Sequence, residues 1–475
     1  MRIVFFCCFL FLINSCTKRE SKTTEKLQPL EKRVDHYLQS LIKADEIPGM
    51  AVAVIKDVQI IHEKYYGLAN IAHNVPVSEN TLFRVYSTTK LITSVAVFQL
   101  IEKGKISLDD SISRYIDNLP KSWNTIKIEH LLSCSSGLPE YKNFDSKISN
   151  KELFNQLIKE PLHFEAGYKY EYNQTNYWFL KLIIEKVTSQ SFEDFIQKSQ
   201  FKDREEEVLF ASNSLVDYPN RVSKYQYNNE YKAYEKTTYA AGNRSLAGNG
   251  MNINLKALLD WNKKLDDNQL LQSETKHLMM SPYAYKNNRF PFGYSWGIYG
   301  PEEKKYYGFT GGGVSAFMKF IDKDLTIVIL SNGFKNRPII ANAITYISGL
   351  IDKDLQRKDR MLNEDIRLAF ILNNYKNAIE IYDGIQQENQ DVVFERGLNS
   401  ASLHYINSLQ VEKSIAIFKF YTEKYPSSSN AFNRLGDAYF NNKQFDMAKI
   451  NYQKALALDS NNKKAKKMIK IIEDN

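Results

Sequence analysis

The sequence is poor in cysteine, which excludes several ways of stabilising a fold or building a reactive site. Only four cysteines occur among 475 residues, and three of them lie within the first sixteen. Cys134 is the only cysteine in the rest of the chain, so no disulfide can form there. The seven histidines lack metal-ligand spacing, and neither H-E-x-x-H nor C-x-x-C occurs. The sequence therefore implies no metal and no other cofactor.

The net charge is not concentrated in one part of the chain, and long apolar runs are also missing. The formal net charge is +8, but the basic residues are spread along the chain. Because nucleic-acid binding requires a concentrated basic surface, we expect no nucleic-acid partner. The apolar run at residues 3–13 is too short to span a bilayer, and it fits the core of a secretory signal.

The end of this run predicts how the chain is attached to the cell. Residues 13–16 read Ile-Asn-Ser-Cys, which resembles a bacterial lipobox. The resemblance implies a lipoprotein signal peptide at 1–16, lipidation of Cys16, and an envelope protein anchored to the membrane, facing the periplasm or the cell surface. The alternative is an ordinary signal peptide in which Cys16 has no role. Residues 17–29 are polar and aperiodic, and they predict a flexible tether.

A serine and a lysine stand at the start of a strongly apolar segment. Residues 87–90 read Ser-Thr-Thr-Lys, and an apolar run follows as far as residue 101. The run predicts a buried helix, with Ser87 and Lys90 sharing one face of its first turn. A desolvated lysine has a lowered pKa and can activate a serine hydroxyl. The alternative is an N-cap serine beside a surface lysine.

Three other segments accompany this pair in a fixed order. Residues 131–139 read Leu-Leu-Ser-Cys-Ser-Ser-Gly-Leu-Pro, and residues 172–177 read Tyr-Asn-Gln-Thr-Asn-Tyr ahead of a predicted helix. Residues 309–313 read Phe-Thr-Gly-Gly-Gly. This last segment lies among predicted antiparallel strands, namely residues 292–299, 306–309, 314–320 and 325–330.

Together these motifs resemble the serine β-lactamase and penicillin-binding-protein superfamily, in its branch of class C β-lactamases, D-aminopeptidases and esterases. The resemblance covers residues 30–350. It implies an α+β fold in which an antiparallel sheet is flanked by helices and accompanied by a helical lobe. It also implies that Ser87 is the nucleophile, that Lys90 is a base or proton relay, and that Tyr172 shares the proton. The backbone N–H groups of Ser87 and Gly312 would form the oxyanion hole.

The substrate-binding positions implied by the resemblance are Gln174, Phe309, Thr310 and Gly311, and two of them depart from the family pattern. Gln174 stands where the family has asparagine, which moves the amide by one methylene. Phe309 stands where the family has lysine or histidine. A substrate carboxylate therefore loses a partner, so the sequence favours a neutral ester or amide over a β-lactam.

The C-terminal part, residues 361–475, predicts helices alone. Residues 431–455 carry aromatic, Leu-Gly, Tyr and Ala residues at a spacing that resembles the tetratricopeptide repeat. Weaker copies precede this one, around Tyr405 and Tyr382. Two or three such repeats would stack on the catalytic unit. They would offer a groove for a protein partner, or else serve as an architectural cap.

Two functions remain open on the sequence alone. The first is a serine hydrolase that works through a Ser87 acyl-enzyme on an ester, amide or peptide. The second is a catalytically inactive module that binds a peptide or cell-wall fragment and recruits partners through its repeats. The Ser-Lys-Tyr set favours the first, and the departures at Gln174 and Phe309 favour the second.

Overall fold

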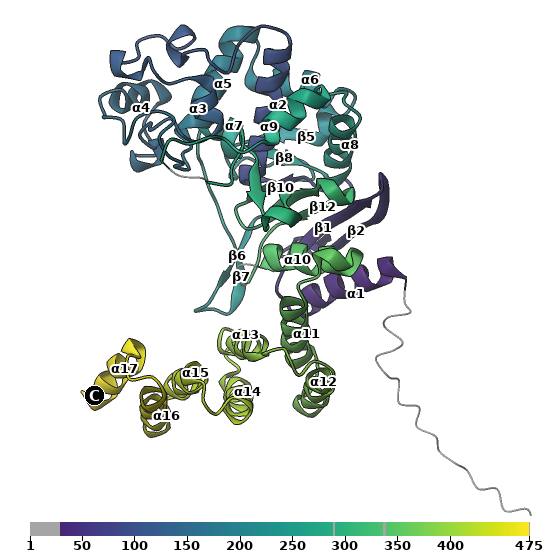
Figure 1. The fold of residues 1–475 in the computed structure, drawn as a ribbon, viewed down its shortest axis with the longest axis vertical. Coiled ribbons are helices and arrows are strands. Elements are labelled where there is room, and N and C mark those ends of the chain that lie inside the picture. The colour runs from purple at the N-terminus through teal and green to yellow at the C-terminus, as the bar shows by residue number, and fades with distance from the viewer. Residues whose placement is uncertain (1–28, 288–289, 336–338, 475) are drawn as a thin grey trace, which may run out of the picture.

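The structure is a computed structural model that describes residues 29–287, 290–335 and 339–474. The expected signal peptide with Cys16, and the expected tether as far as residue 28, lie outside the described residues. Across the described ranges, no helix is long and apolar enough to cross a membrane. The described chain forms a mixed unit of strands and helices, followed by a row of helices (Figure 1).

The mixed unit is organised around a seven-stranded antiparallel sheet, in which the first and last strands of the unit pair at the centre. In spatial order the strands are β3 (Val75–Pro76), β2 (Gln59–Asn70), β1 (Gly49–Lys56), β12 (Leu325–Ser331), β11 (Ser315–Phe320), β10 (Tyr306–Gly311) and β9 (Gly297–Tyr299).

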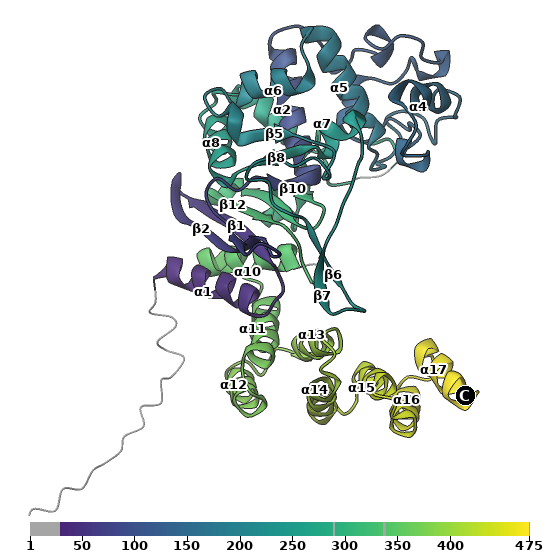
Figure 2. The same cartoon turned by 180° about the vertical axis from the view of Figure 1, so that it is seen from behind.

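The central strands are apolar on both sides because both faces of the sheet are covered. In β1, Val52 and Val54 belong to the core beneath α1 (Leu30–Lys43) and α10 (Ile339–Ile351). The alternate residues Ala51 and Ala53 belong to the larger core on the opposite face. Figures 1 and 2 show α1 and α10 on one side of the sheet and the helical lobe on the other.

The helical lobe and its small strands fill the middle of the chain. Its helices are α2 (Thr89–Glu102), α3 (Ile128–Leu132), α4 (Asn150–Leu157), α5 (Thr175–Thr188), α6 (Phe192–Gln200), α7 (Leu246–Asn249), α8 (Leu255–Asp266) and α9 (Ser273–Met280). A three-stranded sheet and a hairpin accompany them, formed by β4 (Phe83–Arg84), β8 (Met251–Ile253), β5 (Val208–Phe210), β6 (Tyr225–Asn228) and β7 (Ala233–Lys236).

Two local predictions differ from the structure. Ser87 lies in a short 3-10 turn, Tyr86–Thr88, and α2 begins only at Thr89. The expected strand at residues 292–299 is reduced to β9, because the left-handed backbone of Ser295 (φ 70°) interrupts the extended conformation. The predicted fold class, a helix-flanked antiparallel sheet with a helical lobe and a C-terminal helical repeat region, is confirmed.

The C-terminal helices form antiparallel pairs that extend away from the sheet (Figures 1 and 2). Small residues allow close packing within a pair: a Cβ at Gly436 would lie 2.8 Å from the Tyr452 ring. The helices are α11 (Lys358–Leu372), α12 (Tyr375–Glu388), α13 (Glu395–Ile406), α14 (Val411–Lys424), α15 (Ser429–Asn441), α16 (Phe445–Leu458) and α17 (Lys463–Glu473).

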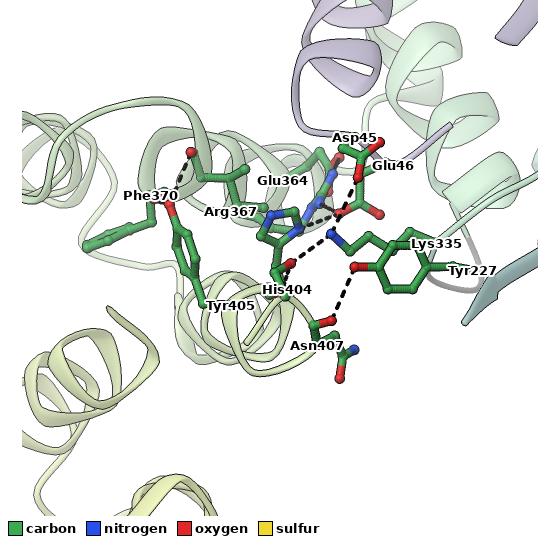
Figure 3. A network of polar contacts seen from close by, with 12 residues as sticks. Asp45, Glu46, Tyr227, Lys335, Glu364, Arg367, Phe370, His404, Tyr405 and Asn407 are labelled. Atoms are coloured by element: carbon green, nitrogen blue, oxygen red, sulfur yellow. Dashed lines mark hydrogen bonds and ion pairs between the residues drawn. The ribbon is translucent and has the colours of Figure 1, made fainter. Parts of the chain in front are cut away.

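A buried polar network joins the first of these helices to the mixed unit (Figure 3). Glu46, between α1 and β1, is completely buried. Its Oε1 accepts hydrogen bonds from Arg367 Nη1 of α11 at 3.1 Å and pairs with His404 Nδ1 of α13 at 3.0 Å. Tyr227 of β6 donates to the carbonyl of Asn407 at 3.3 Å. The repeat region is therefore docked on the mixed unit through specific polar contacts.

Candidate active site

Ser87 occupies a strained turn between β4 and α2. The preceding residue, Tyr86, has a left-handed backbone (φ 47°), which costs free energy in a residue with a side chain. The Tyr86 ring packs against Gly312, where a Cβ would lie 2.9 Å from the ring. The turn is thus held between the start of α2 and the end of β10. Such strain is concentrated at functional sites.

The Ser87 hydroxyl is surrounded by three polar side chains. Tyr172 Oη donates to Ser87 Oγ at 2.7 Å, and Lys90 Nζ lies 3.5 Å from the same oxygen. Ser87 Oγ in turn donates to Asn249 Oδ1 at 3.1 Å. The structure therefore brings together Ser87, Lys90 and Tyr172, which the sequence resemblance selected from segments 85 residues apart.

Lys90 is a fully buried cation surrounded by neutral oxygens. Its Nζ donates to the Gly248 carbonyl at 2.7 Å and to Gln174 Oε1 at 3.1 Å. Among the described residues, no carboxylate lies within ion-pairing distance of it, and Glu140 acts only at longer range. Burial therefore lowers the pKa of Lys90 to about 7.

This geometry suits proton uptake from Ser87. A neutral lysine amine retains two N–H donors and one lone pair. The two short contacts of Nζ, to Gly248 and Gln174, account for the two donors. The third direction, toward Ser87 Oγ, is then left for the lone pair. With a pKa of about 7, a substantial fraction of the Lys90 side chains would be in this form at neutral pH.

Tyr172 is suited to the opposite role. Burial raises the pKa of its phenol to about 12, so the hydroxyl keeps its proton at neutral pH. That proton points at Ser87 Oγ across 2.7 Å. Lys90 Nζ lies 5.0 Å from the centre of the Tyr172 ring. These values favour Tyr172 as a proton donor rather than as a phenolate base.

Gln174 and Asn249 connect the members of the site. Gln174 Oε1 accepts from both Lys90 Nζ and Asn249 Nδ2, the latter at 2.7 Å. The longer amide of Gln174 therefore still supplies an oxygen to the lysine. Gly248 and Asn249 could not be recognised from the sequence, because their segment has no motif and meets Ser87 only through the fold.

The Phe309 position forms an apolar wall where the family has a cation. The Phe309 ring stacks on the Tyr172 ring, with centroids 6.1 Å apart and planes at 27°. Phe292 meets its edge at 6.0 Å. Phe309 is 8 % exposed, so an aromatic stack, and not a charge, borders the candidate nucleophile at this point.

The glycines after Thr310 allow β10 to approach the turn that carries Ser87. A Cβ at Gly311 would lie 1.9 Å from the Val85 carbonyl oxygen, so no other residue fits there. Gly312 has a left-handed backbone (φ 58°) and lies against Tyr86. The oxyanion hole formed by Ser87 and Gly312 stays a prediction, as do the substrate contacts of Gln174, Thr310 and Gly311.

Comparison with known proteins places the chain in a class. Residues 33–347, about two thirds of the chain, match the sequence model of the Beta-lactamase family, and the chain belongs to this family. It is accordingly a member of the serine hydrolase superfamily. Residues 429–462 match the tetratricopeptide repeat. The match confirms both resemblances drawn from the motifs.

Two similar curated proteins come from Bacillus subtilis and Staphylococcus aureus. Penicillin-binding protein 4* of Bacillus subtilis (strain 168) is 27% identical over 330 residues, which cover 64% of this chain and 72% of that protein. Protein flp of Staphylococcus aureus (strain N315) is 30% identical over 189 residues, which cover 38% of this chain. The matched part spans only 37% of the length of Protein flp.

Solved structures show the same fold at low sequence identity. The octameric penicillin-binding protein homologue from Pyrococcus abyssi is 20% identical with a TM-score of 0.61, covering 71% of this chain and 81% of that one. The D-amino acid amidase from Ochrobactrum anthropi SV3 is 16% identical with a TM-score of 0.59, covering 68% of this chain and 99% of that one.

Proposed function

We propose that this protein is a serine hydrolase in which Ser87 forms an acyl-enzyme with an ester, amide or peptide substrate. The observation that carries the proposal is the burial of Lys90 beside Ser87 without a carboxylate in contact among the described residues. A lysine in this state is a base at neutral pH, and a base is what a serine hydroxyl lacks.

The contacts of Ser87 with Lys90 and Tyr172 support the following proton path. Ser87 Oγ attacks the substrate carbonyl carbon while its proton moves to Lys90 Nζ. The Tyr172 phenol gives its proton to the leaving group as the carbonyl–leaving-group bond breaks. Lys90 then returns a proton to Tyr172. Neutral Lys90 then takes a proton from the water that attacks the ester carbonyl, and the Tyr172 phenol gives its proton to Ser87 Oγ as the ester bond breaks, after which Lys90 again returns a proton to Tyr172. The backbone N–H groups of Ser87 and Gly312 would stabilise the oxyanion at both steps.

The residues that line the site favour a substrate that carries no charge near the reacting carbonyl. Phe309 and Tyr172 offer stacked aromatic surface. No cation stands at the Phe309 position to pair with a carboxylate. We infer that a neutral ester or amide is preferred to a β-lactam, whose carboxylate would find no partner at this wall.

The envelope location and the partner of the repeats belong to the same proposal. Lipidation of Cys16 would anchor the enzyme to the membrane. Helices α11 to α17 would present a groove for a protein partner, since the repeats extend away from the sheet (Figure 1). The alternative function is an inactive module that binds a peptide or cell-wall fragment, and the stack of Phe309 on Tyr172 is the feature that favours it.

The test is covalent labelling of the full chain, purified in detergent. A fluorescent fluorophosphonate reports an activated serine, and a fluorescent penicillin reports a lactam-binding cleft. Both are applied to the wild type and to Ser87→Ala. The matched control is Ser94→Ala, which removes another buried serine hydroxyl from α2, one that donates to the Tyr294 carbonyl.

We expect fluorophosphonate labelling in the wild type and in Ser94→Ala, and its complete loss in Ser87→Ala. Weak or absent penicillin labelling would agree with the missing cation. Penicillin labelling as strong as fluorophosphonate labelling would overturn the preference for neutral substrates. Absence of both labels in a folded protein would overturn the hydrolase proposal in favour of the inactive module.

A further inference from the structure

A second pocket lies beside the segment that carries Ser87. It is a small cavity of about 40 Å³, open to solvent, between Tyr86, the segments flanking the β6–β7 hairpin and the end of β12. The charge of its lining is strongly one-sided. Four lining residues are cationic and one is acidic: Arg84, Arg221, Lys224 and Lys236, against Asp217.

Arg84 is the central cation of this pocket, and it is buried without a counter-ion. It is 8 % exposed, and its guanidinium carbon lies 3.5 Å from the centre of the Tyr239 ring and 4.5 Å from that of Tyr86. Within the described part of the chain, no carboxylate pairs with it, and both its Nη1 and the nearby Tyr86 Oη lack a hydrogen-bond partner of ordinary geometry. A buried arginine in this state is costly unless a ligand supplies the missing charge.

Its neighbour on the adjacent strand supplies an acceptor. Arg84 of β4 and Asn252 of β8 are directly paired in the small sheet, and both line the pocket. Asn252 Nδ2 donates to the Leu209 and Gly250 carbonyls, which fixes the orientation of the amide. Its Oδ1 is buried and lacks a donor among the described residues. These two residues, paired on adjacent strands, thus contribute one buried donor and one buried acceptor that are unsatisfied in the same pocket.

We propose that this pocket binds a small oxyanion of the phosphate class. Arg84 Nη1 would donate to a phosphate oxygen, since the guanidinium fork matches that geometry. Asn252 Oδ1 would accept from a P–O–H group, which a partly protonated phosphate carries and a carboxylate does not. Lys236, exposed on β7, would add charge at the mouth.

The position of the pocket places it close to the candidate nucleophile. Arg84 Nε donates to the Asn249 carbonyl at 3.0 Å, and Asn249 Oδ1 accepts the Ser87 hydroxyl. Tyr86, which lines the pocket, immediately precedes Ser87. The proposal nevertheless concerns binding alone and does not depend on the proposed hydrolase activity, because it can be tested on Ser87→Ala protein.

The test is isothermal titration calorimetry of the full-length Ser87→Ala chain in a chloride buffer near neutral pH. The titrants are inorganic phosphate, methyl phosphate and acetate. Two variants are compared: Arg84→Gln removes the buried cation, and Lys236→Glu reverses an exposed charge at the mouth without touching the core. Lys232→Glu is the matched control, because it makes the same change on the same hairpin outside the pocket lining.

We expect one saturable site per chain for inorganic phosphate or methyl phosphate, and acetate binding at least about tenfold weaker. Arg84→Gln should abolish binding, and Lys236→Glu should weaken it at least about threefold, while Lys232→Glu stays within about twofold of the parent. Tighter inorganic phosphate would identify the free ion as the ligand, and tighter methyl phosphate a phosphate monoester. No saturable binding, acetate binding as tight as phosphate, or unchanged binding in folded Lys236→Glu would overturn the proposal.

Discussion

Lys90 and Arg367 are both buried cations on helices, but their surroundings give them opposite properties. Lys90 of α2 is completely buried and faces the oxygens of Gly248, Gln174 and Ser87, all neutral. Arg367 of α11 is 7 % exposed and meets two carboxylates, at 2.6 and 3.1 Å. Burial lowers the pKa of Lys90 to about 7, whereas the two carboxylates raise the pKa of Arg367 above its ordinary value.

The contrast teaches that burial alone does not determine what a cation does. Without a carboxylate in contact, the charged form of Lys90 is costly, and the side chain gives up its proton within the physiological range. With carboxylates in contact, the charge of Arg367 is retained and serves to hold the repeat region on the mixed unit (Figure 3). The first arrangement is suited to chemistry and the second to attachment.

Removing Lys90 should reduce activity more than any other change considered. Lys90→Met keeps the length of the side chain and removes the base. We expect kcat/KM for a fluorogenic ester to fall about a thousandfold. Thermal stability should be unchanged or increased, because a buried group that is costly to charge is replaced by an apolar one. A variant that keeps more than about a tenth of the wild-type rate would show that another group is the base.

The next effect comes from giving Lys90 the kind of partner that Arg367 has. Gln174→Glu places a carboxylate where Gln174 Oε1 now accepts from Nζ at 3.1 Å. An opposite charge at this distance raises a lysine pKa by about 1 to 3 units. We therefore expect about a hundredfold loss of rate at pH 7 that is recovered at alkaline pH.

The matched control for this change is Gln174→Met, which removes the acceptor without adding charge. Its rate profile should not move toward higher pH. If Gln174→Glu and Gln174→Met lost activity equally at all pH values, the charge of Lys90 would not control the reaction.

Removing a charge that pairs with Arg367 should lower stability and leave the chemistry at Ser87 unchanged. Glu46→Gln is isosteric and deprives Arg367 and His404 of a buried charge. We expect the free energy of unfolding to fall by about 2 kcal/mol, with labelling of Ser87 unchanged at room temperature. The control is Asp45→Asn, an equivalent change at the adjacent carboxylate, which is 63% exposed and should cost less than about 0.5 kcal/mol. Equal losses in denaturant melts would contradict a special role for the Glu46 network.

The sequence was informative where a function depends on local spacing. Ser87 and Lys90 are three residues apart, and their apolar helix could be recognised from its composition. The fold class and the family were predicted from the order of short motifs, and both are confirmed. Tyr172 was selected only by its motif, because one tyrosine among thirty carries no signal of its own.

The parts that sequence reasoning missed are contacts between distant segments. Asn249 meets Ser87 across 162 positions, and Glu46 meets Arg367 across 321. Nothing in the local pattern of a Gly-Asn-Gly segment or a lone glutamate indicates such a partner. Phe309 shows the same limit. Its place in the motif of a family cation was evident from the sequence, but its stacking on Tyr172 depends on tertiary packing and was not.

The last prediction concerns the wild type, when only the pH is changed. Because the base form of Lys90 increases through about pH 7, kcat/KM should rise tenfold per pH unit below that value and only about twofold more above it. The pKa of Tyr172 is raised to about 12, so no fall in rate is expected through the moderately alkaline range. The stability of the wild type relative to Lys90→Met should also change with pH, because Lys90 titrates. Its folded pKa lies below its unfolded value, so the cost of burying the ammonium is present below pH 7 and disappears as the pH rises toward the unfolded pKa. A rate midpoint above about pH 9 would mean that Lys90 keeps its proton as Arg367 does, and the difference between the two buried cations would then not explain catalysis.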